Sequence, residues 1–207
     1  MIKNIIFDWS GVIDDSVENH LLVVNEIFRE FGSKEITLEE MRENWVQPYM
    51  LFYNKYLPSL THEQEEAAFK RAILKCPKSK AYSGIVELLK VFKENGIKMV
   101  ILSDNLAEII SGRIKSFGLE GIFIDMVTHV YHKLESIDEL VKRNNFKKEE
   151  TIFIGDSNHE VEEGKNAGVL TGAVTWGYAT KAKLESLKPD FLINNIEELK
   201  EAILGKI

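Results

Sequence analysis

The sequence predicts an α/β protein with a doubly wound parallel sheet and an inserted domain made only of helices. Short apolar runs alternate with longer amphipathic segments along most of the 207 residues, as they do when helices connect parallel strands. One long segment breaks this rhythm, because it contains helical patterns and no run typical of a strand. We therefore expect a core of residues 1–15 and 81–207 and an all-helical cap of residues 16–80.

Five apolar runs are predicted to form the strands of the core sheet. Several of them lack an alternation of apolar and polar residues, which is typical of parallel strands covered by helices on both faces. The runs span residues 5–7, 99–102, 122–124, 152–154 and 191–193.

The segments between these runs are predicted to be helices. In the clearest one, Val86, Leu89 and Phe92 recur with helical spacing, and Gly96 follows where glycine commonly ends a helix. Helices are expected at about 83–95, 107–117, 136–144, 160–167 and 196–204.

The inserted segment has helix signals of its own. Residues 20–31 form an amphipathic pattern that ends at Gly32. Thr37 and Thr61 are each followed three residues later by Glu or Gln, the pattern of a capping box at a helix start. We therefore expect at least three helices here.

Composition restricts the partners of this protein. The formal net charge of −7 argues against nucleic acid and anionic membranes, which attract basic surfaces. No stretch reaches the roughly 18 apolar residues that span a bilayer, and the N-terminus lacks the pattern of a signal peptide. The single cysteine, Cys76, excludes an intrachain disulfide. We expect a cytoplasmic protein that binds neither nucleic acid nor membrane; no signal indicates its oligomeric state.

Polar residues follow the predicted strands at the points where the strands end. Asp8 follows the first run, Ser103 the second and Asp156 the fourth, while Lys133 lies in the loop before the fourth run. Ligands of open parallel sheets bind beyond the carboxyl ends of the strands. Two carboxylates, a hydroxyl and an ammonium are therefore expected to meet at one edge of the sheet.

This set of groups suits phosphoryl transfer. Two carboxylates can hold Mg²⁺, which prefers oxygen ligands and keeps several waters. Asp8 can attack phosphorus as a covalent nucleophile, while the Ser103 hydroxyl and the Lys133 ammonium bind the remaining phosphate oxygens. The sequence therefore predicts a Mg²⁺-dependent enzyme that acts on a small phosphorylated metabolite.

These motifs, in this order, resemble those of the haloacid dehalogenase-like hydrolase superfamily over nearly the whole chain. Residues 5–13 are similar to its first motif and residues 151–157 to its fourth, while residues 166–169 and 174–178 resemble its phosphoglycolate phosphatase and β-phosphoglucomutase-like branch. The resemblance implies a Rossmann-like core, a helical cap and a phosphatase that proceeds through an aspartyl-phosphate.

The resemblance also implies a role for each matching residue. Asp8 would be the nucleophile and a Mg²⁺ ligand, and Asp156 a second ligand. Ser103 and Lys133 would bind phosphate. The two residues that follow Ser103 join the expected phosphate-binding set; they are Asp104 and Asn105.

Two positions depart from the family pattern. Ser10 stands where phosphatases of the family usually carry a second aspartate, which protonates the leaving group and later activates water. A hydroxyl is too weak an acid for that role near neutral pH, although the Ser10 backbone carbonyl can still bind Mg²⁺. Glu160 stands where the family often has Asp, so it is expected in the outer shell of the metal. His20, in the first cap helix, is a further candidate acid.

Other functions remain open at this stage. A phosphonatase-like C–P hydrolase would accept a small residue at Ser10 but needs a cap lysine for a Schiff base, for which Lys55 is the candidate. A dehalogenase is disfavoured because Asp156 supplies a metal ligand. A catalytically weak protein that binds a phosphorylated metabolite is the remaining alternative, and Ser10 is its best argument.

Overall fold

The computed structural model describes residues 1–130 and 133–205. The chain divides into two compact units, a core unit of Met1–Asp15 with Lys80–Ile207 and a helical unit of Ser16–Ser79. The core unit resumes at Lys80, one residue before the expected position, because Lys80 pairs with Asp15. This pairing joins two short antiparallel strands, β2 (Asp14–Asp15) and β3 (Lys80–Ala81).

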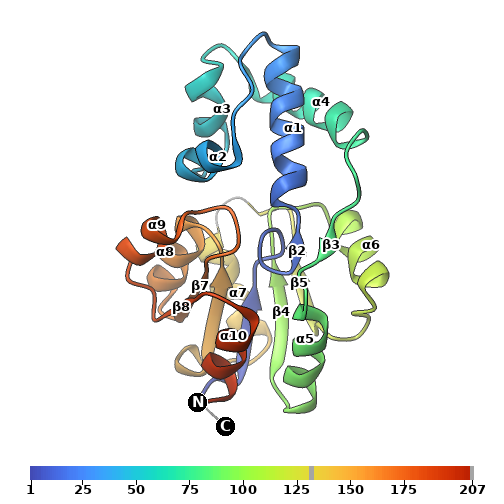
Figure 1. Ribbon diagram of the computed structural model, residues 1–207. Helices are drawn as coiled ribbons and strands as arrows, with labels where there is room; N and C mark the ends of the chain where they lie inside the picture. The colour runs from blue at the N-terminus through green and yellow to red at the C-terminus, as the bar shows by residue number, and fades with distance from the viewer. Residues whose placement is uncertain (131–132, 206–207) are drawn as a thin grey trace. The chain divides into compact units, whose positions relative to one another are not determined.

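The core unit contains a six-stranded sheet in the order β5-β4-β1-β6-β7-β8 (Figure 1). Every neighbouring pair in it is parallel, which confirms the predicted fold class. The strands are β1 (Asn4–Phe7), β4 (Lys98–Leu102), β5 (Asp125–Val127), β6 (Thr151–Gly155), β7 (Leu170–Val174) and β8 (Phe191–Ile193).

The prediction of a strand at residues 122–124 is wrong. The strand begins after this run, at Asp125. The run is apolar because Phe123 packs its ring against Phe7 and Trp9, with centroid distances of 6.4 and 6.2 Å, and because Ile122 is buried beside them. Its residues therefore contribute to the core without pairing in the sheet.

No apolar run in the sequence predicts β7. Its residues, Leu-Thr-Gly-Ala-Val, include a threonine and a glycine and do not form an apolar run. Gly172 faces Ile152 and Ile154 of the neighbouring strand β6, where a β-carbon would come within 3.2–3.3 Å of their side chains. Small residues are thus required at this point of the sheet. Because they are only weakly apolar, the hydropathy pattern does not predict a strand here.

Helices cover both faces of the sheet. They are α5 (Ile85–Glu94), α6 (Ala107–Phe117), α7 (Lys133–Arg143), α8 (Asn158–Ala167), α9 (Lys181–Ser186) and α10 (Ile196–Leu204), with a short 3₁₀ turn η1 (Lys148–Glu150) before β6. Five of them match the expected helices, and α9 was not expected.

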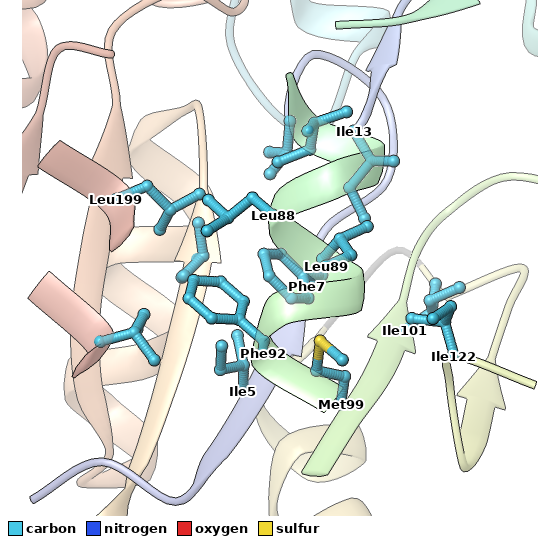
Figure 2. Packing of buried hydrophobic residues seen from close by; sticks show 14 of the residues in the cluster. Ile5, Phe7, Ile13, Leu88, Leu89, Phe92, Met99, Ile101, Ile122 and Leu199 are labelled. Atoms are coloured by element: carbon cyan, nitrogen blue, oxygen red, sulfur yellow. The ribbon is translucent and has the colours of Figure 1, made fainter. Parts of the chain in front are cut away.

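Alternate residues of each strand face opposite helical layers. Ile5 and Phe7 pack with Leu89 of α5, whereas Ile6 packs with α7 on the other face. Figure 2 shows Leu89 and Phe92 of α5 directed at the strands. Each of these side chains is fully buried, and such burial stabilises a fold by about 1.5–3 kcal/mol per large apolar residue.

The helical unit consists of α1 (Val17–Glu30), α2 (Leu38–Asn44), α3 (Met50–Tyr56) and α4 (His62–Ile73). Thr37 and Thr61 are the N-caps of α2 and α4, as expected, and Thr61 forms a complete capping box with Gln64. Rings of Phe28 and Phe52 stack in its interior with centroids 6.2 Å apart. The unit therefore has an aromatic core of its own.

Among the described residues, no helix is long and apolar enough to cross a membrane.

Two mid-helix glycines give a matched test of this packing. A β-carbon at Gly164 of α8 would come within 2.8 Å of Thr171 Cγ2 in β7, whereas Gly112 of α6 has open space around it. Gly112→Ala should raise the free energy of unfolding by about 0.5–1 kcal/mol through helix propensity. Gly164→Ala should lower it by about 1–3 kcal/mol through overpacking. Urea denaturation of both variants measures the difference.

The double variant Gly164→Ala/Thr171→Ser provides the control, because it removes the methyl group that would clash. Its stability should recover toward that of wild type. Equal effects of the two glycine substitutions would contradict the close contact between α8 and β7.

Candidate active site

Asp8 and Asp156 lie at the carboxyl ends of neighbouring strands. Phe7 of β1 is in register with Ile154 of β6, and the backbone N–H of Asp8 donates to the Ile154 carbonyl at 2.9 Å. Both aspartates are buried, with 6% and 3% of their surface exposed. The structure therefore brings the two expected carboxylates to one edge of the sheet.

Lys133 lies between two carboxylates at this edge. Its Nζ donates to Asp8 Oδ1 at 2.7 Å and to Glu160 Oε1 at 2.9 Å. Nζ also lies 5.7 Å from the centre of the Phe153 ring, and the side chain is 4% exposed. A buried ammonium needs such partners, because an unpaired charge in an apolar site is very costly.

Burial and charge shift the pKa of each group in this cluster. Burial acts to lower the pKa of Lys133, but Asp8 and Glu160 outweigh it and raise the pKa. Burial raises the pKa of Asp8 to about 7, with Lys133 opposing the shift. For Glu160, burial is outweighed by Lys133 and by the Ser157 hydrogen bond, which together lower the pKa to about 2. Lys133 and Glu160 are therefore charged at neutral pH.

Glu160, in the first turn of α8, lies in the same buried cluster as Lys133. Its carboxylate binds Lys133 and also accepts from the Ser157 backbone N–H at 3.0 Å and the Ser157 hydroxyl at 2.5 Å. Its role in the outer shell of a metal stays a prediction. Gly155 makes room for this arrangement, because a β-carbon there would overlap Glu160 Cβ and Cγ. Glu160 thus connects the N-cap of α8 to Lys133.

The Asp156 carboxylate is enclosed by two glycines and a backbone donor. Tyr178 N–H donates to Asp156 Oδ2 at 2.6 Å. A β-carbon on either Gly11 or Gly177 would overlap the same oxygen. Burial raises the pKa of Asp156 well above its ordinary value, and the charges of Glu160 and Asp8 add to the shift.

Sequence reasoning did not assign a role to these three neighbours of Asp156. Gly11 lies in the motif of residues 5–13, and Gly177 and Tyr178 lie in that of residues 174–178. Their common property is a close approach of the backbone to one carboxylate, which depends on loops after β1 and β7 meeting in space. The glycines themselves were the available signal, because a glycine often marks such an approach.

The loop after β4 carries the remaining expected residues. Ser103 is fully buried, and its Oγ accepts from the backbone N–H of Asn105 at 3.3 Å. Asp104 is half-buried, and burial raises its pKa while Lys133 opposes the shift. Asn105 Nδ2 donates to Ser10 Oγ at 2.7 Å. The structure therefore links Ser10, two positions after Asp8, to the loop after the neighbouring strand.

His20 and Lys55 both lie in the helical unit. The His20 ring packs edge-on against Trp45, with centroids 4.9 Å apart, and near Phe69 at 6.4 Å. Burial lowers the pKa of His20 to about 4, so its imidazole is neutral at pH 7. Lys55 is exposed, contacts Asn44 Oδ1 and extends over the Tyr56 ring.

The charges of the cluster are compatible with a cation. Asp8, Asp156 and Glu160 are buried at this edge of the sheet, and Lys133 is the one lysine buried within residues 1–130 and 133–205. Ionisation of all three carboxyl groups would leave an excess of negative charge beside Lys133, which a divalent ion would balance. The described residues include no group of three or more His, Cys, Asp or Glu side chains placed to hold a metal, so any ion would complete its shell with backbone oxygen and water, as Mg²⁺ commonly does.

The fold and this cluster define the class of protein as an enzyme with a doubly wound α/β core and an acidic site at the strand ends. Residues 5–174 match the family model of the haloacid dehalogenase-like hydrolases. The chain belongs to this family, as the resemblance of its motifs predicted.

Relatives and solved structures agree with this assignment. The pyrophosphatase PpaX of Listeria welshimeri is 31% identical over 179 residues, covering 84% of this chain and 71% of the relative. A structure described as a predicted phosphatase from Clostridium acetobutylicum superposes with a TM-score of 0.83 at 20% identity over 100% of both chains. Another, described as a predicted phosphoglycolate phosphatase from Haemophilus somnus, has a TM-score of 0.78 at 17% identity over 97% of both chains. At these identities the two structures show the likeness of the fold.

His20 should make the protein less stable in acid. Its folded pKa of about 4 lies below the unfolded value of 6.5, so the unfolded chain binds more protons between these values. The stabilisation by neutral His20 is complete above pH 6.5 and is lost as the pH falls toward 4, by about 2 kcal/mol at pH 5. His20→Phe should remove this loss, as measured by urea unfolding at pH 7 and pH 5.

Glu65 of α4 provides a control of opposite sign. It is 3% exposed, and burial raises its pKa to about 7 from 4.5. The stabilisation of the fold by protonated Glu65 is therefore complete below pH 4.5 and is lost as the pH rises through 7. Glu65→Gln should therefore gain stability relative to wild type over this range. If His20→Phe and wild type lost equal stability in acid, the assigned effect of His20 would be wrong.

Proposed function

We propose that this protein is a Mg²⁺-dependent phosphohydrolase that acts on a small phosphorylated metabolite through an aspartyl-phosphate on Asp8. The observation that carries the proposal is the buried cluster in which Lys133 contacts both Asp8 and Glu160 beside a second aspartate, Asp156. A lysine held against a buried nucleophile can bind the phosphate oxygens that approach that nucleophile.

Each residue of the cluster would have its own role in the reaction. Asp8 supplies a carboxylate oxygen that attacks phosphorus, and Lys133 stabilises the charge on the transferred group. Ser103 Oγ accepts a hydrogen bond from Asn105 N–H, so its own proton is available for a phosphate oxygen. Glu160 acts as a positioning residue, because it accepts a hydrogen bond of 2.9 Å from Lys133.

Asp8, Asp156 and the Ser10 backbone carbonyl are the proposed ligands of Mg²⁺. When bound, the ion would neutralise phosphate charge and offset the repulsion between the buried aspartates. The Tyr178 N–H already occupies Oδ2 of Asp156. This contact would fix the orientation of the carboxylate that would bind the ion.

Relatives described as pyrophosphatases support phosphate chemistry for this chain. A Schiff-base mechanism of the phosphonatase type finds less support. It requires a lysine that loses its proton near neutral pH, usually through burial, whereas Lys55 is exposed and hydrogen-bonded to Asn44. Ser10 remains the argument for the second candidate function, binding of a phosphorylated metabolite with weak or no turnover.

Asp8→Asn should abolish phosphate release, because an amide cannot act as the nucleophile. Purified protein would be screened against phosphate monoesters, pyrophosphate, phosphonoacetaldehyde and 2-haloacids, with Mg²⁺ or with EDTA. Phosphate release that requires Mg²⁺ and falls by at least about 10³-fold in Asp8→Asn is expected. Asp15→Asn is the matched control, because Asp15 is an exposed aspartate of the core unit and should retain full activity. Full activity in EDTA would disprove the metal assignment.

Asp156→Asn should weaken Mg²⁺ binding by about tenfold or more, since it removes a charged ligand. Isothermal titration of the protein with Mg²⁺, in the absence of any substrate, measures this affinity directly. Asp138→Asn serves as the control, because Asp138 is exposed and pairs with Lys148 on the surface. Identical affinities of the two variants would exclude Asp156 as a ligand.

A further inference from the structure

The hydrogen bond between Asn105 and Ser10 points to a restriction on the substrate. We propose that these two residues form a fixed hydrogen-bond donor in place of a carboxylic acid. The site then acts on substrates whose leaving group departs as a stable anion, which are acyl phosphates, phosphoanhydrides and phosphates of acidic phenols. The inference rests on the proposed function of Asp8 as the nucleophile.

Ser10 is held in a rigid turn of the backbone. Gly11 N–H donates to the Asp14 carbonyl at 2.9 Å, and the N–H groups of Ile13 and Asp14 both donate to the Trp9 carbonyl at 3.0 Å. Gly11 has a φ of +75°, a conformation that glycine adopts without strain. The position of Ser10 relative to Asp8 is therefore set by the main chain.

Asn105 is fixed from two sides. Its N–H donates to Ser103 Oγ at 3.3 Å, and its carbonyl accepts from His129 N–H at 3.0 Å. These contacts leave the side-chain amide directed at Ser10, where Nδ2 donates to Oγ at 2.7 Å. Asn105 thus acts as a positioning residue for the Ser10 hydroxyl.

The direction of this hydrogen bond decides what Ser10 can do. A hydroxyl has one proton to donate and can also accept. Because Oγ of Ser10 accepts from Asn105, its proton is left for another oxygen, such as that of a leaving group. The hydroxyl can stabilise negative charge there by a hydrogen bond, but it does not transfer its proton near neutral pH.

In the first step, a carboxylate oxygen of Asp8 forms a bond to phosphorus as the bond from phosphorus to the leaving oxygen breaks. The electron pair goes to the leaving oxygen, which departs as an anion with a hydrogen bond from Ser10. In the second step, the oxygen of water forms a bond to phosphorus as the bond from phosphorus to Asp8 breaks, the electron pair of that bond returns to Asp8, and both protons of the water leave with the phosphate product.

The two steps have different consequences for kinetics. Without proton transfer, the first step depends strongly on the acidity of the leaving group, because general acid catalysis contributes roughly 10²–10⁴-fold when it operates. The second step is the same for every substrate. We therefore expect kcat/KM to vary with the leaving group, while kcat is similar for all activated substrates. Release of about one leaving group per chain should precede the steady state as a burst.

The test uses substituted phenyl phosphates of nearly equal shape, so that binding differs little along the series. Wild-type kcat/KM should fall by roughly 10²-fold from p-nitrophenyl phosphate to phenyl phosphate. Ser10→Asp introduces a carboxyl group that can still accept from Asn105, and it should reduce this fall to less than about tenfold by accelerating the poorer substrates.

Two further variants test the positioning role of Asn105. Ser10→Ala and Asn105→Ala should each steepen the dependence on the leaving group and should not be additive, since both remove the same donor. The controls are Ser186→Ala and Asn95→Ala, two exposed residues of the core unit, which should leave the dependence unchanged. Circular dichroism and thermal unfolding verify that each variant folds.

The outcomes separate this inference from the proposed function. Equal wild-type kcat/KM along the series would overturn the inference and leave Asp8 chemistry intact, because another group would then protonate the leaving oxygen. An unchanged dependence in Asn105→Ala would overturn the role of Asn105. Absence of phosphate release from every substrate, with Asp8→Asn indistinguishable from wild type, would overturn both proposals.

Discussion

The arrangement of the candidate active site depends on the two ion pairs that Lys133 makes with Asp8 and Glu160. An ammonium that is 4% exposed is stable only beside carboxylates at hydrogen-bond distance. The pairs connect the end of β1 with the first residue of α7 and the first turn of α8, three segments far apart in the sequence. Because each partner would be left as an unpaired buried charge without the others, the three segments stabilise one another's positions.

Close packing of backbone against carboxylates is the second requirement of this site. Gly155 leaves room for Glu160, while Gly11 and Gly177 approach Asp156 from two different loops. A side chain at any of these positions would displace a carboxylate by more than the tolerance of a metal site or a hydrogen bond. These glycines are therefore needed because they leave space for the neighbouring carboxylates. Of the three, only Gly11 has a positive φ and so also needs the conformational freedom of glycine.

The residue at position 10 is where this chain departs from the usual phosphatase pattern of its family. Lys133 contacts both Asp8 and Glu160. Ser10, in contrast, stands in place of the usual aspartate, and its hydroxyl accepts a hydrogen bond from Asn105. His20 stays a predicted acid, although burial lowers its pKa to about 4. In the proposed mechanism, Lys133 supports the attack on phosphorus, whereas departure of the leaving group depends on the acidity of that group in the substrate.

The sequence by itself determined the class of fold and the position of most helices, because buried parallel strands are apolar on both faces and amphipathic helices have a regular period. It also indicated that Asp8 and Asp156 would meet, since both follow strands of one parallel sheet. Tertiary structure alone decided that Glu160 binds Lys133 and that Asn105, 95 positions away, binds Ser10. No local pattern encodes such contacts, because they arise only when loops and helices distant in the chain pack together.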